Sequence, residues 1–243
     1  MSLQGDTQVG QCWRDLADVI DAGVTRVLLY GPPGTGKTYA ALHFGVGHSV
    51  AERLVCTEDL TTGEITGTWM PTGEGRWQWR EGPAIRAWHD ESGLGGRLVV
   101  DEVDRASGDA LSTLLAVTDS SESARWRNPE TGAWVSPGPR FSVVMTTNLE
   151  DLGAIPAALR DRFAVAIRID QPHPDAVGLL SEDLRHAALV GSLADAPRRL
   201  SLRSFYAFDR LRSHLGSERA AQLVFGTERA ESVLDALRIR ALG

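Results

Sequence analysis

The 243-residue sequence contains little cysteine, almost no lysine and no long apolar run. Its two cysteines, Cys12 and Cys56, lie far apart and form no C-x-x-C pair, which argues against a zinc ribbon or a thioredoxin-like redox site. This cysteine content fits a reducing cytosol, so a cytoplasmic location is expected. No stretch approaches 18 consecutive apolar residues, and the first ten residues lack a basic segment followed by an apolar one. Neither membrane insertion nor secretion is therefore expected.

The overall composition is that of an ordinary folded protein. The chain has 25 basic and 32 acidic residues, a net charge of −7, and 42% hydrophobic residues. These values exclude a disordered, collagen-like or disulfide-scaffold protein. The length allows one or two domains.

The single lysine is the first candidate functional residue. Of the 25 basic side chains, one is lysine, Lys37, and the others are arginine. Codon bias explains most of the arginines but does not explain this exception. An ammonium is a compact point charge, whereas a guanidinium is a planar fork, so the two are not interchangeable at a binding site.

Five apolar runs predict the strands of one sheet, at residues 26–30, 53–56, 97–100, 141–145 and 164–169. Helical patterns lie before and between them, at 11–22 and at about 36–47, 83–91, 107–117 and 156–161. Continuous apolar strands that alternate with helices are typical of an α/β fold, in which helices cover both faces of a parallel sheet.

The character of the sequence changes after residues 171–174. No strand-like run follows, and three or four arginine-rich amphipathic helices are predicted up to residue 242. We therefore place a boundary between an α/β domain at 1–171 and an α-helical domain at 172–243. Residues 196–243 carry nine arginines against five acids, which a solvated helix face explains equally well.

Residues 31–38 read GPPGTGKT and fit the phosphate-binding pattern G-x-x-x-x-G-K-[ST] between a predicted strand and a predicted helix. Glycines let backbone N–H groups turn inward around phosphate oxygens, and the helix presents its positive end to the same anion. Lys37 can reach the β- and γ-phosphates, and the Thr38 hydroxyl can ligate Mg²⁺. ATP and Mg²⁺ are the expected cofactors. The candidate nucleotide-binding residues are Gly31, Pro32, Pro33, Gly34, Thr35, Gly36, Lys37, Thr38 and Tyr39.

Two carboxylates follow the apolar run at 97–100. Charges at the end of such a strand are costly unless something offsets them, and ligands of open α/β sheets lie at the carboxyl ends of the strands. Asp101 would hold Mg²⁺ with Thr38, and Glu102 would polarise the attacking water.

Polar residues elsewhere add candidates for the same chemistry. Asn148 follows the strand at 141–145 and would orient water or contact the γ-phosphate, unless it only starts a turn. Arg160 and Arg162 lie around a predicted helix end. An arginine supplied across a subunit boundary accelerates phosphoryl transfer by roughly 10³ to 10⁵. A surface ion pair with Asp161 is the competing explanation for one of them.

The motifs GPPGTGKT, LVVDEVDR, TTN and ALRDRF, in this order and spacing, resemble those of the AAA+ ATPases, and among them the MoxR branch with its NorQ and CbbQ group. The resemblance covers roughly residues 20–215. It implies that Lys37 and Thr38 belong to Walker A, and Asp101 and Glu102 to Walker B. The remaining implied roles are Asn148 as sensor 1, Arg162 as arginine finger with Arg160 as a second candidate, and Arg203 as sensor 2, with Arg198 and Arg199 nearby.

The same resemblance implies a P-loop domain with a small helical lid, Mg²⁺-dependent ATP hydrolysis, and ATP bound between the protomers of a hexameric ring. It further implies a chaperone that remodels or activates a partner protein, such as one with a von Willebrand factor A domain. A nucleic-acid motor or loader is the main alternative, although the acidic net charge argues against it. A structural module with negligible turnover is a third, against which Glu102, Asn148 and Arg162 argue.

Two inserts, at about 61–82 and 122–140, resemble the helix 2 insert and the pre-sensor 1 hairpin of the MoxR branch. A turn centred on Glu130 would place Trp126 opposite Trp134 in the second insert. Five of the seven tryptophans lie in the inserts, interleaved with arginines. Such residues either bind a protein or a single nucleic-acid strand, or only hold the hairpins together.

Overall fold

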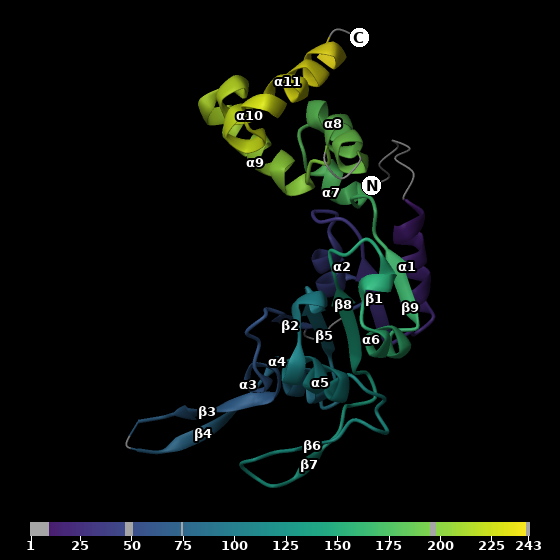
Figure 1. Ribbon diagram of the computed structural model, residues 1–243, viewed down its shortest axis with the longest axis vertical. Coiled ribbons are helices and arrows are strands. Elements are labelled where there is room, and N and C mark those ends of the chain that lie inside the picture. The colour runs from purple at the N-terminus through teal and green to yellow at the C-terminus, as the bar shows by residue number, and fades with distance from the viewer. Residues whose placement is uncertain (1–9, 47–50, 74, 195–197, 242–243) are drawn as a thin grey trace. The chain divides into compact units, whose positions relative to one another are not determined.

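The computed structural model describes residues 10–46, 51–73, 75–194 and 198–241 (Figure 1). These residues divide into two compact units. The larger unit contains the described parts of 15–31 and 37–168, and the other contains 10–14, 32–36 and the described parts of 169–241. The domain boundary placed at residues 171 and 172 stays a prediction.

A parallel sheet of five strands forms the centre of the larger unit within the described residues, and it confirms the predicted α/β fold. Its strand order is β2-β5-β8-β1-β9, and all neighbours are parallel. The strand ends differ by one or two residues from those predicted. The strands are β1 (Arg26–Tyr30), β2 (Ala51–Val55), β5 (Arg97–Asp101), β8 (Ser142–Thr146) and β9 (Val165–Arg168).

Helices cover both faces of this sheet, as predicted. On one face, alternate strand residues such as Leu98, Val100 and Met145 join a core with α3 (Thr62–Thr66), α4 (Pro83–His89) and α5 (Gly108–Val117). The residues between them face α2 (Lys37–His43), which packs on β2, β5 and β8. Burial on both faces explains why the central strands β1, β5 and β8 read as continuous apolar runs. The remaining helices of this part of the chain are α1 (Gln11–Asp21) and α6 (Ala157–Arg162).

Strand β5 holds both ends of α2. Near the start of the helix, the Thr38 hydroxyl donates to Asp101 Oδ1 at 2.9 Å. At its end, the buried Arg97 guanidinium donates to the Ala41 carbonyl at 3.1 Å and to the Phe44 carbonyl. Arg97 and Asp101 reach the same helix because residues an even number apart in a strand share a face. This arrangement fixes α2 against the sheet, with its first residues beside Asp101.

We expect Arg97→Leu to lower the free energy of unfolding by about 2 kcal/mol, because it leaves buried carbonyls without their charged donor. The measurement is the urea midpoint at constant slope. A matched control is Arg86→Leu, because Arg86 forms an exposed ion pair with Glu52 at 2.6 Å, and such pairs are worth less than about 1 kcal/mol. Equal midpoints for Arg97→Leu and the parent would contradict the role given to Arg97.

Each insert forms an antiparallel hairpin on the larger unit, and both hairpins extend from the same end of it in Figure 1. β3 (Gly67–Pro71) pairs with β4 (Trp77–Glu81), and β6 (Trp126–Arg127) pairs with β7 (Trp134–Val135). The rings of Trp69 and Trp126 lie 5.7 and 5.8 Å from that of Trp79. The contact between Trp79 and Trp126 joins the two hairpins.

The predicted pairing of Trp126 with Trp134 is wrong. Trp126 lies opposite Val135, and Arg127 lies opposite Trp134. Asn128 explains the shift: its backbone N–H donates to the Ala133 carbonyl at 2.9 Å, which centres the loop one half-residue later than Glu130. The two tryptophans therefore point to opposite faces. Trp126 packs inward, whereas Trp134 is 70% exposed.

The other unit contains, within its described residues, five helices and no strand, where three or four helices were predicted. Gly216 and Gly226, both with positive φ, end α9 and α10 and divide what otherwise reads as longer helices. Phe205, Phe208 and Phe225 lie in the core of this unit. In the described ranges, no helix combines the length and apolarity needed to cross a membrane. The helices are α7 (Pro174–Gly178), α8 (Glu182–Leu193), α9 (Leu202–Leu215), α10 (Ser217–Phe225) and α11 (Thr227–Ala241).

Candidate active site

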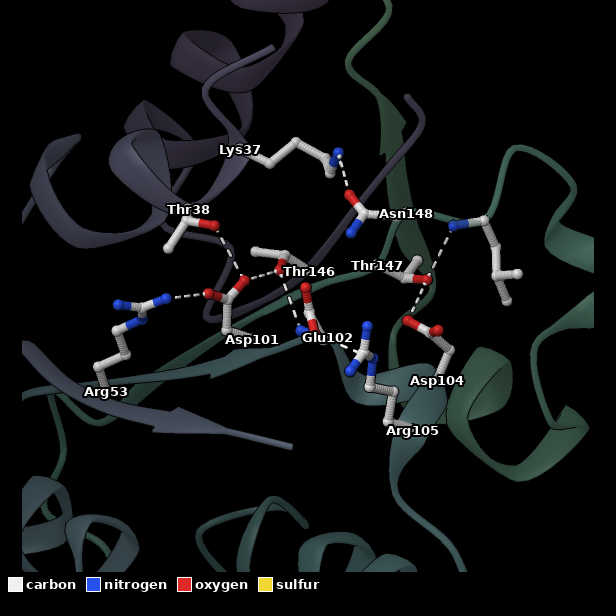
Figure 2. Close-up of polar contacts among 11 residues, drawn as sticks. Lys37, Thr38, Arg53, Asp101, Glu102, Asp104, Arg105, Thr146, Thr147 and Asn148 are labelled. Atoms are coloured by element: carbon white, nitrogen blue, oxygen red, sulfur yellow. Dashed lines mark hydrogen bonds and ion pairs between the residues drawn. The ribbon is translucent and has the colours of Figure 1, made fainter. Parts of the chain in front are cut away.

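The carboxyl ends of three neighbouring strands bring the candidate residues together. β1, β8 and β5 are adjacent and parallel, so the segments that follow them start at one edge of the sheet. Residues 31–36 follow β1, Asp101 ends β5, and Asn148 lies just after β8. Figure 2 shows the side chain of Lys37 beside Asn148 and that of Thr38 beside Asp101. In open α/β sheets this edge is where ligands bind.

The loop after β1 has the backbone that its glycines were predicted to supply. Gly31, Gly34 and Gly36 have φ values of 126°, 81° and 102°, a region that residues with a Cβ rarely enter. The Thr35 hydroxyl donates to the Pro32 carbonyl at 3.2 Å, which closes the loop on itself. A substitution at any of these glycines would strain the loop.

Lys37 is buried, with 5% of its surface exposed. Its Nζ donates to the Gly31 carbonyl at 2.8 Å and to Asn148 Oδ1 at 3.1 Å. Both of these acceptors are uncharged oxygens. The structure therefore brings Lys37 and Asn148 together, as Figure 2 shows.

Asp101 accepts three side-chain hydrogen bonds (Figure 2). Oδ1 accepts from Thr38 and Thr146, and Oδ2 lies 2.5 Å from Nη2 of Arg53. Burial by itself would raise the pKa of Asp101, but the three donors outweigh it and hold the pKa below its usual range. Asp101 is therefore a carboxylate at neutral pH.

The donors beside Lys37 suit a magnesium ion. Thr38 and Asp101 present a hydroxyl and an ionised carboxylate next to each other, and Mg²⁺ prefers such hard oxygen ligands. Thr38 and Asp101 would therefore hold Mg²⁺. The ion would supply positive charge to neutralise phosphate oxygens.

Glu102 has a strained backbone. It is the one non-glycine residue with positive φ in the described ranges, at φ 56° and ψ 45°. Such a conformation costs roughly 1–3 kcal/mol and is often found at functional sites. The kink ends β5 and turns the side chain to Arg105, whose Nε lies 3.0 Å from the carboxylate. Glu102 is thus held as an ion pair beside the Asp101 cluster.

Threonines after β8 bind the residues that follow β5. The Glu102 N–H donates to the Thr146 hydroxyl at 3.4 Å, and the Thr147 hydroxyl donates to Asp104 at 2.6 Å. These contacts tie the two acids to the segment that carries Asn148 (Figure 2). The sequence reasoning missed five residues of this network, although two of them, Thr146 and Thr147, end or directly follow β8. The five are Arg53, Asp104, Arg105, Thr146 and Thr147.

Cys56 lies next to this network but has no chemical role in it. Burial and the nearby charges of Asp104, Asp101 and Glu102 raise the pKa of its thiol to about 12. The thiol is therefore neutral, and a neutral thiol is a poor nucleophile.

The two candidate finger arginines differ in their surroundings. Arg162 Nη1 lies 2.8 Å from Asp119 Oδ2, and the Arg162 side chain is 30% exposed. Its partner is Asp119, whereas the competing explanation for one of the two arginines was an ion pair with Asp161. Arg160 is exposed, and within the described residues its side chain makes no hydrogen bond or ion pair.

Two further candidates are Tyr39 in α2 and Arg203 in α9. Tyr39 is 62% exposed, and its ring contacts that of His43 at 4.4 Å. Arg203 is exposed near the start of α9, and Arg199 donates to the Ala194 carbonyl at 3.2 Å. The sensor 2 role stays a prediction for Arg203, with Arg198 and Arg199 still open.

Residues 26–163 match the family described as AAA domain, dynein-related subfamily, and this match covers more than half of the 243 residues. The chain belongs to the dynein-related AAA family. No curated protein matches the sequence. Among solved structures, a protein described as a candidate ATPase from Cytophaga hutchinsonii is 22% identical, with a TM-score of 0.47 over 69% of this chain and 48% of that one. The chain thus spans about half the length of that protein.

The AAA match includes most of the candidate site. It contains the loop at 31–38, both acids after β5, Asn148 and the two arginines of α6, and it stops before the helical unit. The match thus assigns residues 26–163 to a class of nucleotide-binding ATPase domains, while the role of each residue stays a prediction.

Proposed function

We propose that this AAA protein is a Mg²⁺-dependent ATPase of the MoxR branch. One observation carries the proposal: the buried Lys37 ammonium donates to the Gly31 carbonyl and to Asn148 Oδ1, and the Thr38–Asp101 pair lies at the next residue of the same helix. An ammonium, a hydroxyl and a carboxylate in this order suit a triphosphate with its metal ion.

Each residue would have a distinct task in hydrolysis. Lys37 would bind the β- and γ-phosphate oxygens, and Asn148 would give up its contact with Lys37 to orient the water. Glu102 would accept a proton from that water, a step for which a positioned carboxylate contributes about 10² to 10⁴ in rate. Arg105 forms an ion pair with the Glu102 carboxylate, which would have to bind the water at the same time. Arg203 would be the sensor 2 residue, as the family resemblance implies.

We place ATP between neighbouring protomers of a ring, with Arg162 supplied to the next subunit. Within its own subunit, Arg162 pairs with Asp119 at 2.8 Å, so its guanidinium is engaged there by a carboxylate. The hexameric number and the second role of Arg160 rest on the family resemblance alone.

We further propose a cytoplasmic chaperone that remodels or activates a partner protein, for which a von Willebrand factor A domain protein is the candidate. Large exposed apolar side chains on the hairpins support a partner surface. Trp77 is 62% and Trp134 is 70% exposed, whereas neighbouring Trp79 and Trp126 hold the hairpins together.

A nucleic-acid motor is the second candidate, because exposed Arg76, Arg80 and Arg127 lie among these tryptophans. The net charge of −7 disfavours it. A salt-sensitive gel shift with single-stranded DNA at physiological salt would favour the motor over the chaperone.

The shared site is tested with Arg162→Ala. We expect this variant to bind ATP like the parent but to lose about 10³-fold in phosphate release, because the finger acts only on the transition state. Mixing it with Glu102→Gln subunits should restore part of the activity, since intact fingers then meet intact Glu102 residues. The control is Arg168→Ala, an exposed arginine that pairs with Glu150 at 3.2 Å. Absence of any restoration would argue against a site shared between subunits.

A further inference from the structure

We propose that Asp119 is a positioning residue that orients the Arg162 guanidinium for the neighbouring subunit's nucleotide. The inference rests on the proposed function, because it requires that Arg162 act across a subunit boundary. The geometry that supports it lies within the larger unit and involves three elements: the end of α5, the start of β1 and the end of α6.

The backbone of Asp119 is fixed by a residue from the start of β1. Arg26 Nε donates to the Thr118 carbonyl at 2.9 Å, and Arg26 Nη2 donates to the Asp119 carbonyl at 2.5 Å. Thr118 is fully buried, and its hydroxyl donates to the Leu114 carbonyl at 2.7 Å. A charged fork on two successive carbonyls leaves the end of α5 little freedom. The Asp119 carboxylate therefore projects from a rigid point.

The backbone of Arg162 is fixed as well. Leu159 and Phe163, on either side of it in the chain, are each 2% exposed, and the Phe163 N–H donates to the Leu159 carbonyl at 3.0 Å. What remains free is the long side chain, which has many rotamers. The ion pair of Nη1 with Asp119 restricts these rotamers. It leaves Nη2 and Nε as donors for a phosphate oxygen.

Arg160 lies in the same helix as Arg162 but has no carboxylate partner among the described residues. Its side chain is exposed and makes no ion pair within the described residues. An unheld guanidinium must lose its rotamer freedom when the subunits meet, whereas Arg162 has lost much of it beforehand. Asp119 therefore accounts for why Arg162, and not Arg160, is suited to act as the finger.

We expect Asp119→Asn and Asp119→Ala to lower kcat for ATP hydrolysis by about 10- to 100-fold, since small misplacements of a catalytic group have effects of this size. The KM for ATP should not change, because the substitution leaves Lys37, Thr38 and Asp101, the groups proposed to bind the nucleotide and its metal ion, unchanged. Asp119→Glu, which keeps the charge, should recover part of kcat. Glu150→Ala is the control, since it removes an exposed carboxylate from the Arg168 pair. Thermal unfolding of each variant reports on folding, and Asp119→Asn preserves the side-chain shape.

Mixing separates positioning from a structural defect. Asp119→Asn subunits have an intact Glu102 but a poorly held finger, whereas Glu102→Gln subunits have a well-held finger. A mixture should therefore release more phosphate per Asp119→Asn subunit than Asp119→Asn alone. A mixture of Arg162→Ala with Glu102→Gln subunits serves as the reference for how much activity mixing can restore.

The outcomes distinguish the two proposals. If Arg162→Ala is restored by mixing but Asp119→Asn is not, the positioning role is overturned and the shared site stands. If neither is restored, the shared site fails, and the positioning role fails with it. An unchanged or higher kcat for Asp119→Asn alone would also overturn the inference, because the carboxylate would then be idle or would hold Arg162 back.

Discussion

Replacing Glu102 with glutamine should lower ATP hydrolysis by about 10² to 10⁴ while leaving ATP affinity nearly unchanged. The amide has the shape of the carboxylate and can still accept from Arg105, so the positive-φ turn at 102 should persist. It cannot accept a proton from water. Glu102 contacts neither Lys37 nor Asp101 through its carboxylate in Figure 2, so the groups that would bind phosphate and metal remain in place.

The measurement combines phosphate release with ATP binding on the same preparation. Glu130→Gln, at the exposed loop of the second hairpin, is the matched control and should hydrolyse ATP like the parent. Unchanged hydrolysis by Glu102→Gln would remove the glutamate from its proposed role. Loss of ATP binding would show instead that the kink at 102 is needed to build the site.

The second large effect is expected at Lys37. Lys37→Met should weaken ATP binding by 100-fold or more, which corresponds to about 2.7 kcal/mol. Methionine keeps much of the buried volume, so the loss comes from the ammonium that would meet the β- and γ-phosphates. The Gly31 carbonyl and Asn148 Oδ1 lose their donor, so the variant without nucleotide should also unfold at a lower temperature than the parent.

Isothermal titration with ATP and Mg²⁺ measures this effect. Lys37→Arg provides a sharper comparison, because it keeps the charge but replaces a point charge with a planar fork in a buried position. We expect it to bind more weakly than the parent as well. Equal affinity for Lys37→Met and the parent would refute the role of the lysine.

Sequence patterns predicted the central strands β1, β5 and β8 well because these strands are buried on both faces and therefore read as unbroken apolar runs, whereas the edge strands β2 and β9 are partly exposed. An apolar run does not indicate what the polar residues at its two ends contact. Arg97 begins such a run. Because side chains alternate between the two faces of a strand, Arg97 and Asp101 both lie on the face of β5 that packs on α2. Strand β5 therefore holds both ends of this helix. A charged residue at the start of an apolar strand was the available signal.

Local hydrogen bonds determine several features that hydrophobic patterns do not predict. The Thr61–Glu64 capping box that starts α3 follows a readable T-x-x-E pattern, but it was not used. The register of the second hairpin depends on Asn128, whose side chain accepts from the N–H groups of Glu130 and Thr131 at 2.8 and 3.1 Å. No periodicity encodes that choice. The contact between Arg162 and Asp119 joins residues 43 positions apart, and sequence spacing does not predict such pairs.

Retention of a fluorescent ATP analogue in equilibrium dialysis, with millimolar Mg²⁺ present, tests the central claim most directly. The account predicts that the parent protein retains the analogue, that excess unlabelled ATP displaces it, and that Lys37→Met retains almost none. Equal concentrations of the analogue on both sides of the membrane with the parent protein would contradict the assignment of residues 31–38 as a triphosphate site.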